Sequence, residues 1–400
     1  MSAAVATAES ERQVSVRHVA WAGVALGVLA WLIALPPILL RTPVPSLVLA
    51  ACGVAAGAWA IGRDERRAGW GAVAAGVAGA VGAVASTRSG VGHLEDVVVW
   101  SALIAAMLRF ATPLIFGSLG GIVSERSGVV NIGIEGMMLT GAFFGILGAD
   151  LTGSWVLGLL AGMAAGGVLA LVHAVFSITL RADQIVSGVA INLLALGITG
   201  YVFVDRYGAQ GTPDDIPRAP DITLPGIRDI GFVGDAIGRA NLLTWLALLT
   251  AAGLAVFLFR TPQGLRLRAV GEHPRAAETV GLSVICTRYA AVVASGVLAA
   301  IGGAYLSIGF LGSFNQNMTA GRGYIALAAV IFGKWKPGGA LAAALLFGFS
   351  SALAQRLPAF SGSTATLFQA LPYVLTLIAV AGVIGRSRPP AAVGQPYTRE

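Results

Sequence analysis

Charged residues are scarce in this chain: Asp, Glu, Lys and Arg together make up 11% of its 400 residues, whereas 56% are hydrophobic. A water-soluble chain of this composition would need an apolar core far larger than a single domain normally builds. Hydrophobic runs recur along nearly the whole length, and many approach the roughly 20 residues that cross about 30 Å of hydrocarbon. The sequence therefore predicts an all-α, polytopic membrane protein with about 10–12 transmembrane helices in a lipid bilayer.

Cysteine and histidine are also sparse. Cys52 and Cys286 alone provide neither a disulfide framework nor a cysteine metal site, and the four histidines are scattered. No His-Glu-x-x-His or Gly-x-Ser-x-Gly pattern occurs, which disfavours an intramembrane enzyme. Lys334 lacks the upstream glycine pattern and the downstream Ser or Thr of a phosphate-binding loop. We therefore expect no catalytic residue, metal or cofactor in this chain, and any ATP to be used by a partner subunit.

The distribution of charge predicts an orientation. The net charge of +7 does not indicate nucleic acid, because the basic residues lie in short loops between apolar runs. The segment 260–288 carries five arginines against two glutamates, so we expect it in the cytoplasm. The insert at 205–240 holds six aspartates against four arginines and lies an odd number of spans away, so we expect it outside. This topology places both termini on the cytoplasmic side of the membrane.

Twelve apolar runs are candidate spans. The run at 321–333 is short and bracketed by glycines, so it is either a full crossing or a broken, re-entrant helix. Arg109 interrupts another run, so either it points into the bundle or the span starts later. The first run is too long for a signal-peptide core, and we expect it to be retained. The candidate spans are 19–40, 46–62, 69–87, 97–117, 130–149, 155–176, 184–205, 241–260, 288–312, 321–333, 338–356 and 367–385.

The spans predict a division of the chain. An N-terminal tail, 1–18, precedes extra N-terminal spans within 19–96, and a transmembrane core follows at 97–385. The core contains an extracytoplasmic loop at 206–240 and a cytoplasmic loop at 261–287, and a C-terminal tail covers 386–400. For the extra N-terminal spans we expect peripheral packing around the core.

One cytoplasmic stretch has the signals of a short helix. Pro274 suits a first helical position and Gly281 a left-handed cap, so a two-turn helix of roughly 10 Å fits between them. The helical spacing places Ala276, Ala277 and Val280 on one face, which would fit a groove of a partner without steric demand. The alternative is an ordinary solvated loop helix.

A second stretch combines polar groups with glycines inside an apolar region. Glu125, Arg126, Asn131 and Glu135 lie among five glycines between 120 and 136. Irregular backbone at membrane depth is tolerated only against protein or a water-filled cavity, so these residues are candidates for a polar solute path or its gate. The alternative places Glu125 and Arg126 in a cytoplasmic turn and the other two in packing or capping roles.

Two further polar sets lie between the apolar runs. Gln316 and Arg322 belong to a set that the topology places outside, and Asp183 and Gln184 precede another span on the inside. Both sets are either loop residues or ligands for a neutral polar solute, because Asn and Gln hydrogen-bond such solutes well.

Five ordered motifs carry a resemblance across residues 100–385, and they are Ala111-Thr-Pro-Leu-Ile, Ser124-Glu-Arg-Ser-Gly-Val-Val-Asn-Ile-Gly-Ile-Glu-Gly-Met-Met138, Arg181-Ala-Asp-Gln-Ile-Val-Ser-Gly188, Gly271-Glu-His-Pro-Arg-Ala-Ala and Gly321-Arg-Gly-Tyr-Ile-Ala-Leu-Ala-Ala-Val-Ile-Phe-Gly-Lys-Trp-Lys-Pro337. Together they resemble the ABC-importer permeases of the branched-chain amino acid and simple-sugar superfamily. The second and fifth motifs resemble its nucleoside-type branch.

The resemblance implies ABC-permease architecture, alternating access and three kinds of partner: a cytoplasmic ABC ATPase, a second related permease and an extracytoplasmic solute-binding lipoprotein. It also implies that the short helix is the ATPase-coupling element, formed by Gly271, Glu272, His273, Pro274, Arg275, Ala276, Ala277 and Gly281. We expect import of nucleosides, which as neutral solutes need no intramembrane counter-ion. A simple sugar, riboflavin or a branched-chain amino acid is the alternative within the family, and an ion-coupled secondary transporter is the alternative outside it.

Overall fold

The computed structural model describes residues 16–31, 44–88, 99–356 and 388–398. Within these ranges nine helices are long and apolar enough to cross a membrane, and two further apolar helices are shorter. The predicted all-helical, polytopic class is therefore confirmed. The predicted span at 367–385 lies outside the described residues.

The chain forms two compact units, Met1–Trp100 and Ser101–Glu400. The first unit contains the helix Val16–Trp31, α2 (Val44–Ile61) and α3 (Arg66–Arg88). Small residues allow these helices to approach closely: a Cβ on Gly57 would lie only 2.7 Å from the carbonyl oxygen of Gly69.

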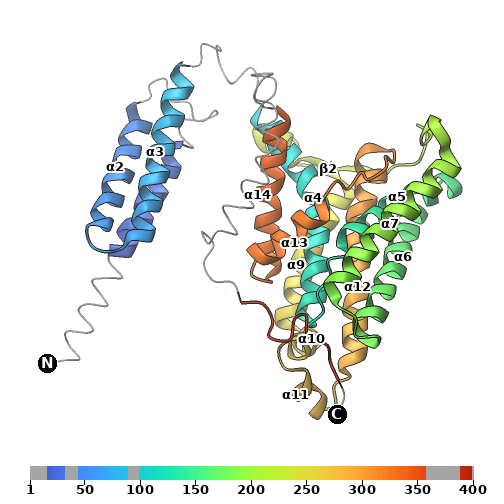
Figure 1. Ribbon diagram of the computed structural model, residues 1–400. Helices are drawn as coiled ribbons and strands as arrows, with labels where there is room; N and C mark the ends of the chain where they lie inside the picture. The colour runs from blue at the N-terminus through green and yellow to red at the C-terminus, as the bar shows by residue number, and fades with distance from the viewer. Residues whose placement is uncertain (1–15, 32–43, 89–98, 357–387, 399–400) are drawn as a thin grey trace. The chain divides into compact units, whose positions relative to one another are not determined.

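The second unit is a helical bundle with two three-residue strands in one connection (Figure 1). Its elements are α4 (Trp100–Arg126), α5 (Ile134–Thr152), α6 (Trp155–Ala174), η2 (Val175–Thr179), α7 (Gln184–Tyr207), η3 (Gly208–Gln210), β1 (Asp221–Thr223), α8 (Gly231–Ile237), β2 (Arg239–Asn241), α9 (Leu242–Arg260), α10 (Pro262–Glu272), α11 (Pro274–Thr279), α12 (Val284–Ala304), η4 (Tyr305–Leu311), α13 (Arg322–Phe332) and α14 (Pro337–Arg356). The strands pair antiparallel, with Asp221 opposite Asn241.

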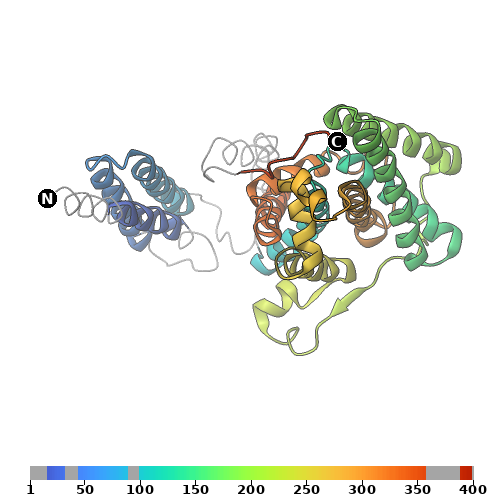
Figure 2. The ribbon, with the colours of Figure 1, turned by 90° about the horizontal axis from the view of Figure 1, so that it is seen from below.

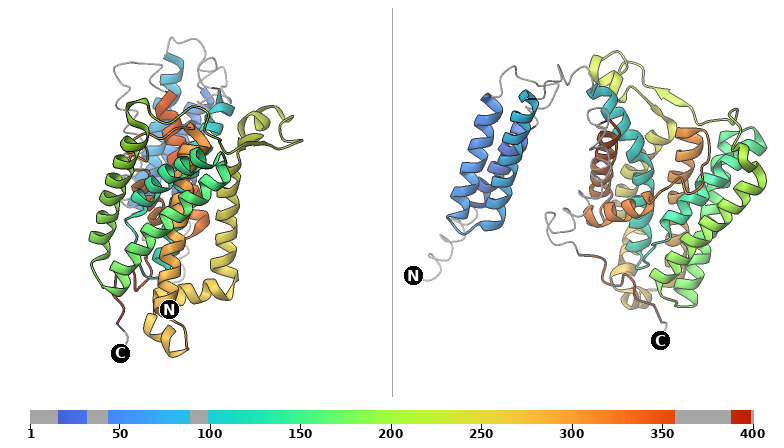
Figure 3. Two further views of the ribbon diagram at one scale, coloured as in Figure 1. Left: turned by 90° about the vertical axis from the view of Figure 1, so that its right-hand side faces the viewer. Right: turned by 45° about the horizontal axis from the view of Figure 1, so that its top comes forward.

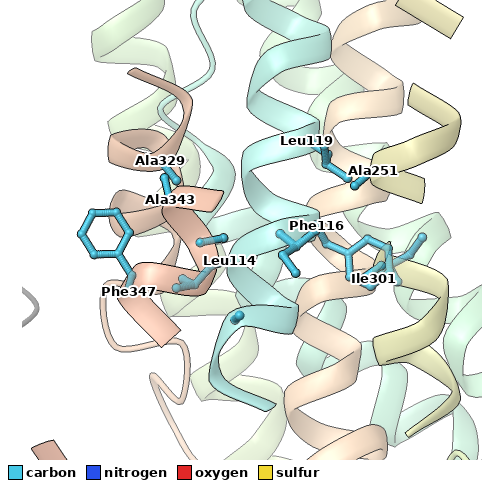
Figure 4. Packing of buried hydrophobic residues seen from close by; sticks show 12 residues of the cluster. Leu114, Phe116, Leu119, Ala251, Ile301, Ala329, Ala343 and Phe347 are labelled. Atoms are coloured by element: carbon cyan, nitrogen blue, oxygen red, sulfur yellow. The ribbon is translucent and has the colours of Figure 1, made fainter. Parts of the chain in front are cut away.

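Helix α4 lies between α14 on one side and α9 and α12 on the other (Figure 4). Phe116 and Leu119 pack with α9 and α12, whereas Leu114 lies toward Phe347 of α14. The predicted end of this span at residue 117 is wrong, because the helix continues to Arg126. Its glycines do not break it; they allow neighbouring backbones to approach, as Gly120 does with the Ser295 carbonyl.

Helix α13 is a half-length helix. It has 11 residues, about 16 Å at 1.5 Å per residue, which is roughly half of the hydrocarbon thickness. Gly117 and Gly121 of α4 face Ala326 and Val330, so α13 runs beside the second half of α4 only. Of the two alternatives for this run, the broken helix is therefore correct. Arg322 is the first residue of α13, so it belongs to this helix and not to the loop before it.

The two ends of the second unit carry different elements. The β1–β2 connection lies at one end, and α10 and α11 lie at the other (Figure 1). Helix α10 runs across the end of α9, and α11 projects beyond it (Figure 3, left). Figure 2 views the bundle from this end, where the tail 388–398 also lies. The acidic insert and the basic loop are therefore on opposite ends, as the charge pattern requires.

Candidate functional site

Helix α4 ends in a hydrogen-bonded cluster at the α10–α11 end. Glu125, of which 8% is exposed, accepts a 2.5 Å hydrogen bond from Nε1 of Trp335. The neighbouring Arg126 donates from Nε and Nη2 to the Trp335 carbonyl oxygen, at 3.0 and 2.9 Å. Its Nη1 lies 3.9 Å from Oε1 of Glu272, at the end of α10. The cluster therefore links α4 both to the α13–α14 turn and to α10.

The α13–α14 turn holds Trp335 in an unusual backbone conformation. Lys334 and Trp335 have φ angles of 52° and 54°, a left-handed region that costs L residues of order 1–3 kcal/mol each. The contacts from Glu125 and Arg126 compensate for this strain, because they fix both the indole and the carbonyl of Trp335. A turn held in this way has a defined position relative to α4.

The helices α10 and α11 follow from local capping signals. Thr261 accepts a hydrogen bond from the Gly264 amide at the start of α10, and Pro262 occupies a first-turn position. Pro274 begins α11, and Gly281 has a φ of +83°, so both predicted signals are confirmed. Sequence reasoning missed α10, although Thr261-Pro262 is a typical helix start.

The predicted common face of α11 is wrong for Ala277. Its side chain is 3% exposed and packs with Val270 and Val284 inside the chain. Ala276 and Val280 are exposed, and Val280 is 75% accessible. Ala276 and Ala277 are neighbours in this six-residue helix and point in different directions, so Ala277 faces the inside of the chain while Ala276 stays exposed. Any partner therefore meets Ala276 and Val280.

The C-terminal tail packs against this region. The amide of Ala392 donates to the Gly271 carbonyl at 2.9 Å, and the amide of Gly394 donates to Gly128 at 3.2 Å. Arg288, 2% exposed, donates to the carbonyls of Ser127 (3.2 Å) and Gln395 (3.1 Å). The tail, α12 and the segment after α4 are thus joined by hydrogen bonds.

A buried loop, residues 127–133, connects α4 and α5 inside the bundle, and side chains from α6 and α7 satisfy its backbone. His173 contacts the Val130 carbonyl at 3.0 Å, and Gln184 Oε1 accepts from the Val130 amide at 2.7 Å. Asn192 donates to the Ile132 carbonyl and accepts from the Gly136 amide. The loop is irregular but hydrogen-bonded, as membrane depth requires.

Glu135 joins the start of α5 to the start of α13. Its Oε1 accepts from the Gly321 amide at 2.8 Å, and its Oε2 accepts from the Gly323 amide at 2.5 Å. A carboxylate at a helix N-terminus satisfies free amides and interacts favourably with the helix dipole. Arg322 donates to the carbonyls of Met318 and Thr319, which closes the turn before α13. In this conformation Glu135 is therefore a cap of the half-length helix.

The other predicted path residues are apart from this cap. Asn131 is fully buried and donates to Ser295 Oγ at 2.9 Å, and its Oδ1 has no hydrogen-bond partner among the described residues. Gln316 is exposed in the segment between η4 and α13. The structure therefore brings Glu135 and Arg322 together, places Glu125 with Trp335, and leaves Gln316 separate.

Arg109 lies in α4 at the opposite end of the unit. The helix begins at Trp100, and the Arg109 side chain lines a cavity of about 370 Å³. The same cavity is lined by Asp221 and Arg239, which form an ion pair of 3.2 Å between β1 and β2. A polar cavity at this end explains how a cation fits within an apolar helix.

Several residues of these clusters were not predicted: Trp335, His173, Asn192 and Arg288. The sequence indicates these polar contacts only in part. A buried histidine inside an apolar run and a tryptophan beside two lysines are polar-contact candidates, but only the fold shows which backbone groups they meet.

Most of the second unit matches a known protein family. Residues 103–380 match the family described as branched-chain amino acid transport system / permease component. The chain belongs to this permease family. The match begins at the third residue of the second unit, so the permease fold coincides with α4 and the elements after it.

The permease has curated relatives that match about three quarters of its length. The guanosine ABC transporter permease protein NupQ of Bacillus subtilis is 44% identical over 318 residues, which cover 76% of this chain and 99% of the relative. The nucleoside ABC transporter permease protein NupC of Lactococcus lactis is 39% identical over 74% of this chain and 96% of its own length. A putative glucose ABC transporter permease of Haloferax volcanii is 39% identical over 65% of this chain and 78% of its length. No solved structure matches the permease.

Proposed function

We propose that this permease is the membrane-spanning subunit of an ATP-driven importer for nucleosides in a bacterial inner membrane. The observation that carries the proposal is the match to the guanosine and nucleoside permeases over 99% and 96% of their lengths. The second unit supplies a complete bundle for that role, because the whole matched family segment falls within it. The glucose relative supports a sugar as the second candidate solute.

The ATPase partner docks on α10 and α11. These helices project from the bundle on the end that bears the basic loop, and α11 presents the small Ala276 and the apolar Val280. A short helix with small exposed side chains fits a groove of a partner without steric demand. This assignment puts the α10–α11 end and the tail in the cytoplasm, and the β1–β2 connection outside.

Movement of the docked helices reaches the bundle through the Arg126 cluster. Glu272 ends α10 and lies 3.9 Å from Arg126, which in turn holds the Trp335 carbonyl at the end of α13. At its other end α13 is held by Glu135. Displacement of α10 therefore acts on α13, which is fixed at both of its ends. A switch of α13 between two packed positions would open or close the solute path.

A second related permease and an extracytoplasmic solute-binding lipoprotein complete the importer. The permeases NupP of Bacillus subtilis and NupB of Lactococcus lactis are 25% and 24% identical to this chain, each in the same organism as one of the nearer relatives. Two related permeases in one organism support a paired arrangement. ATP itself is used by the ATPase subunit and not by this chain.

Uptake in cells that express the full importer tests the substrate. We expect ATP-dependent uptake of labelled guanosine, adenosine or uridine that excess ribose, riboflavin and leucine leave intact. If nucleosides are not transported while one competitor is, the nucleoside assignment is wrong and the importer assignment stands. Uptake that persists without the ATPase would instead identify an ion-coupled transporter.

The docking assignment has its own test. Ala276→Trp places a bulky side chain on the exposed side of α11, so we expect loss of ATPase copurification and of uptake with normal membrane insertion. The control is Ala209→Trp, a change at another exposed alanine, in η3 at the β1–β2 end. Normal ATPase assembly in the Ala276 variant would refute docking at α11.

A further inference from the structure

A crevice lies between α9, α10 and α12, close to the α10–α11 end of the bundle. It encloses about 770 Å³, and Val123 of α4 lies among its lining residues. Ala290 and Ala294 are one helical turn apart on α12, and their small side chains leave the space open. The remaining apolar lining is Leu254, Phe257, Leu267, Leu282, Ala291, Val297 and Leu298.

The mouth of the crevice differs from its interior. Gln263 and Arg266 of α10, together with Ser283 just before α12 and Thr287 within it, line the side nearest the loop. Arg266 is exposed, and the ion pairs found among the described residues do not include it. The crevice therefore combines apolar walls with a mouth that carries one positive charge.

The length of the crevice matches one leaflet of a bilayer. Ser283 and Leu298 both line it, and α12 advances about 22 Å between them at 1.5 Å per residue. Half of a hydrocarbon core of about 30 Å is roughly 15 Å, and the rest corresponds to the polar boundary. The site is thus as long as an acyl chain with the first part of its head group.

The walls exclude a polar solute, because they offer no hydrogen-bonding groups beyond the mouth. The surrounding loop, 260–288, has five arginines against two glutamates, and basic pockets between helices on the cytoplasmic side attract anionic lipid. We propose that the crevice binds an anionic phospholipid, with one acyl chain between α9 and α12 and the phosphate at Arg266.

Lipid retention by the assembled importer tests the proposal. The complex is purified in detergent containing phosphatidylglycerol or phosphatidylcholine, and bound lipid is counted by native mass spectrometry. We expect phosphatidylglycerol to be retained preferentially. Ala294→Trp fills the crevice and should abolish this retention, whereas Ala252→Trp, on an exposed position of α9 outside the crevice, should not.

The charge is tested separately on an exposed position, where folding is not at risk. Arg266→Gln should reduce the preference for phosphatidylglycerol about fivefold, the effect of one basic residue near an anionic surface. Arg260→Gln makes the same change in the same loop outside the crevice and should have little effect. Equal retention of the two lipids, or equal effects of the two arginine changes, would overturn the proposal.

Cys286 provides an independent probe, because it is exposed and lines the crevice. With Cys52→Ser this chain has a single thiol. Alkylation of Cys286 by a maleimide, followed by mass analysis of this chain, should be slower in phosphatidylglycerol vesicles than in phosphatidylcholine vesicles. The same rate in both would contradict the proposal, and a thiol inaccessible in both would show a subunit interface in place of a lipid site.

Discussion

The two units of this permease solve the problem of folding in a membrane differently. In the first, the buried side chains are small, such as Ala20, Ala50 and Ala60, and Ser46 is the one polar group among the buried side chains of its described residues. The second unit also has close glycine contacts, but it buries Glu125, His173 and other polar groups. Close packing is thus sufficient for helix association, whereas buried polar groups carry an added cost that indicates function.

The similarity to known relatives begins close to the boundary between the two units. The family segment starts at residue 103, and NupQ is covered almost completely by a match to three quarters of this chain. The buried polar contacts belong to the part that relatives share, and the glycine-rich unit is additional. Perturbing equivalent contacts in the two units should therefore have unequal consequences.

The largest expected difference comes from a matched pair of glycine substitutions. Gly303→Val would force a side chain into the Met138 carbonyl of α5, and Gly27→Val would force one into the backbone of Ala75 and Gly76 in α3. Both disrupt helix packing by several kcal/mol. We expect uptake and assembly to be lost only in the Gly303 variant, measured at equal membrane abundance. Equal loss of uptake and assembly in both variants would show that transport depends on both units to the same extent.

A smaller effect is expected at the end of α13. Trp335→Phe keeps the aromatic ring but removes the donor to Glu125, leaving a buried carboxylate without that hydrogen bond. Hydrogen bonds to charged groups contribute about 1.5–3 kcal/mol, so we expect a roughly tenfold or larger drop in uptake. Insertion and ATPase copurification should be unchanged.

The double variant distinguishes a direct contact from general damage. Glu125→Gln lowers the cost of the missing donor, so its effect combined with Trp335→Phe should be smaller than the sum of the two single effects. The loss for the double variant should be close to that of one single variant. Additive losses would show that the two side chains act separately, and that the cluster does not hold the turn as a unit.

A still smaller effect is expected at the other end of α13. Glu135→Gln keeps one acceptor oxygen for the two amides of Gly321 and Gly323 and removes the charge at the helix start. Loss of a cap costs about 1 kcal/mol, so faster amide exchange across α13 and a severalfold fall in uptake should result. Asp205→Asn, at an exposed position near the end of α7, is the control. Unchanged exchange in α13 would contradict the capping role.

Composition and periodicity were sufficient to predict the fold class and most spans, because lipid imposes a length and an apolar character on each crossing. They were insufficient where tertiary contact decides. In the extended part of α4, Gly120 packs against Ser295 of α12, and Ala277 is buried because Val270 and Val284 lie beside it. Likewise, Glu125 and Glu135 were recognised as polar groups in an apolar region, but their partners at Trp335 and Gly323 are about 200 positions away.

The smallest effect is expected from removing the first unit altogether. A chain beginning at Trp100 retains α4 and every later element, and its length is close to that covered in NupQ. Since compact units with their own packing are in principle separable, uptake per inserted molecule should stay within about twofold of the full chain. Uptake is measured with the partner subunits and normalised to membrane abundance. Uptake that is abolished despite normal insertion would show that the glycine-rich unit takes part in transport. The second unit would then not be sufficient for transport with the partner subunits.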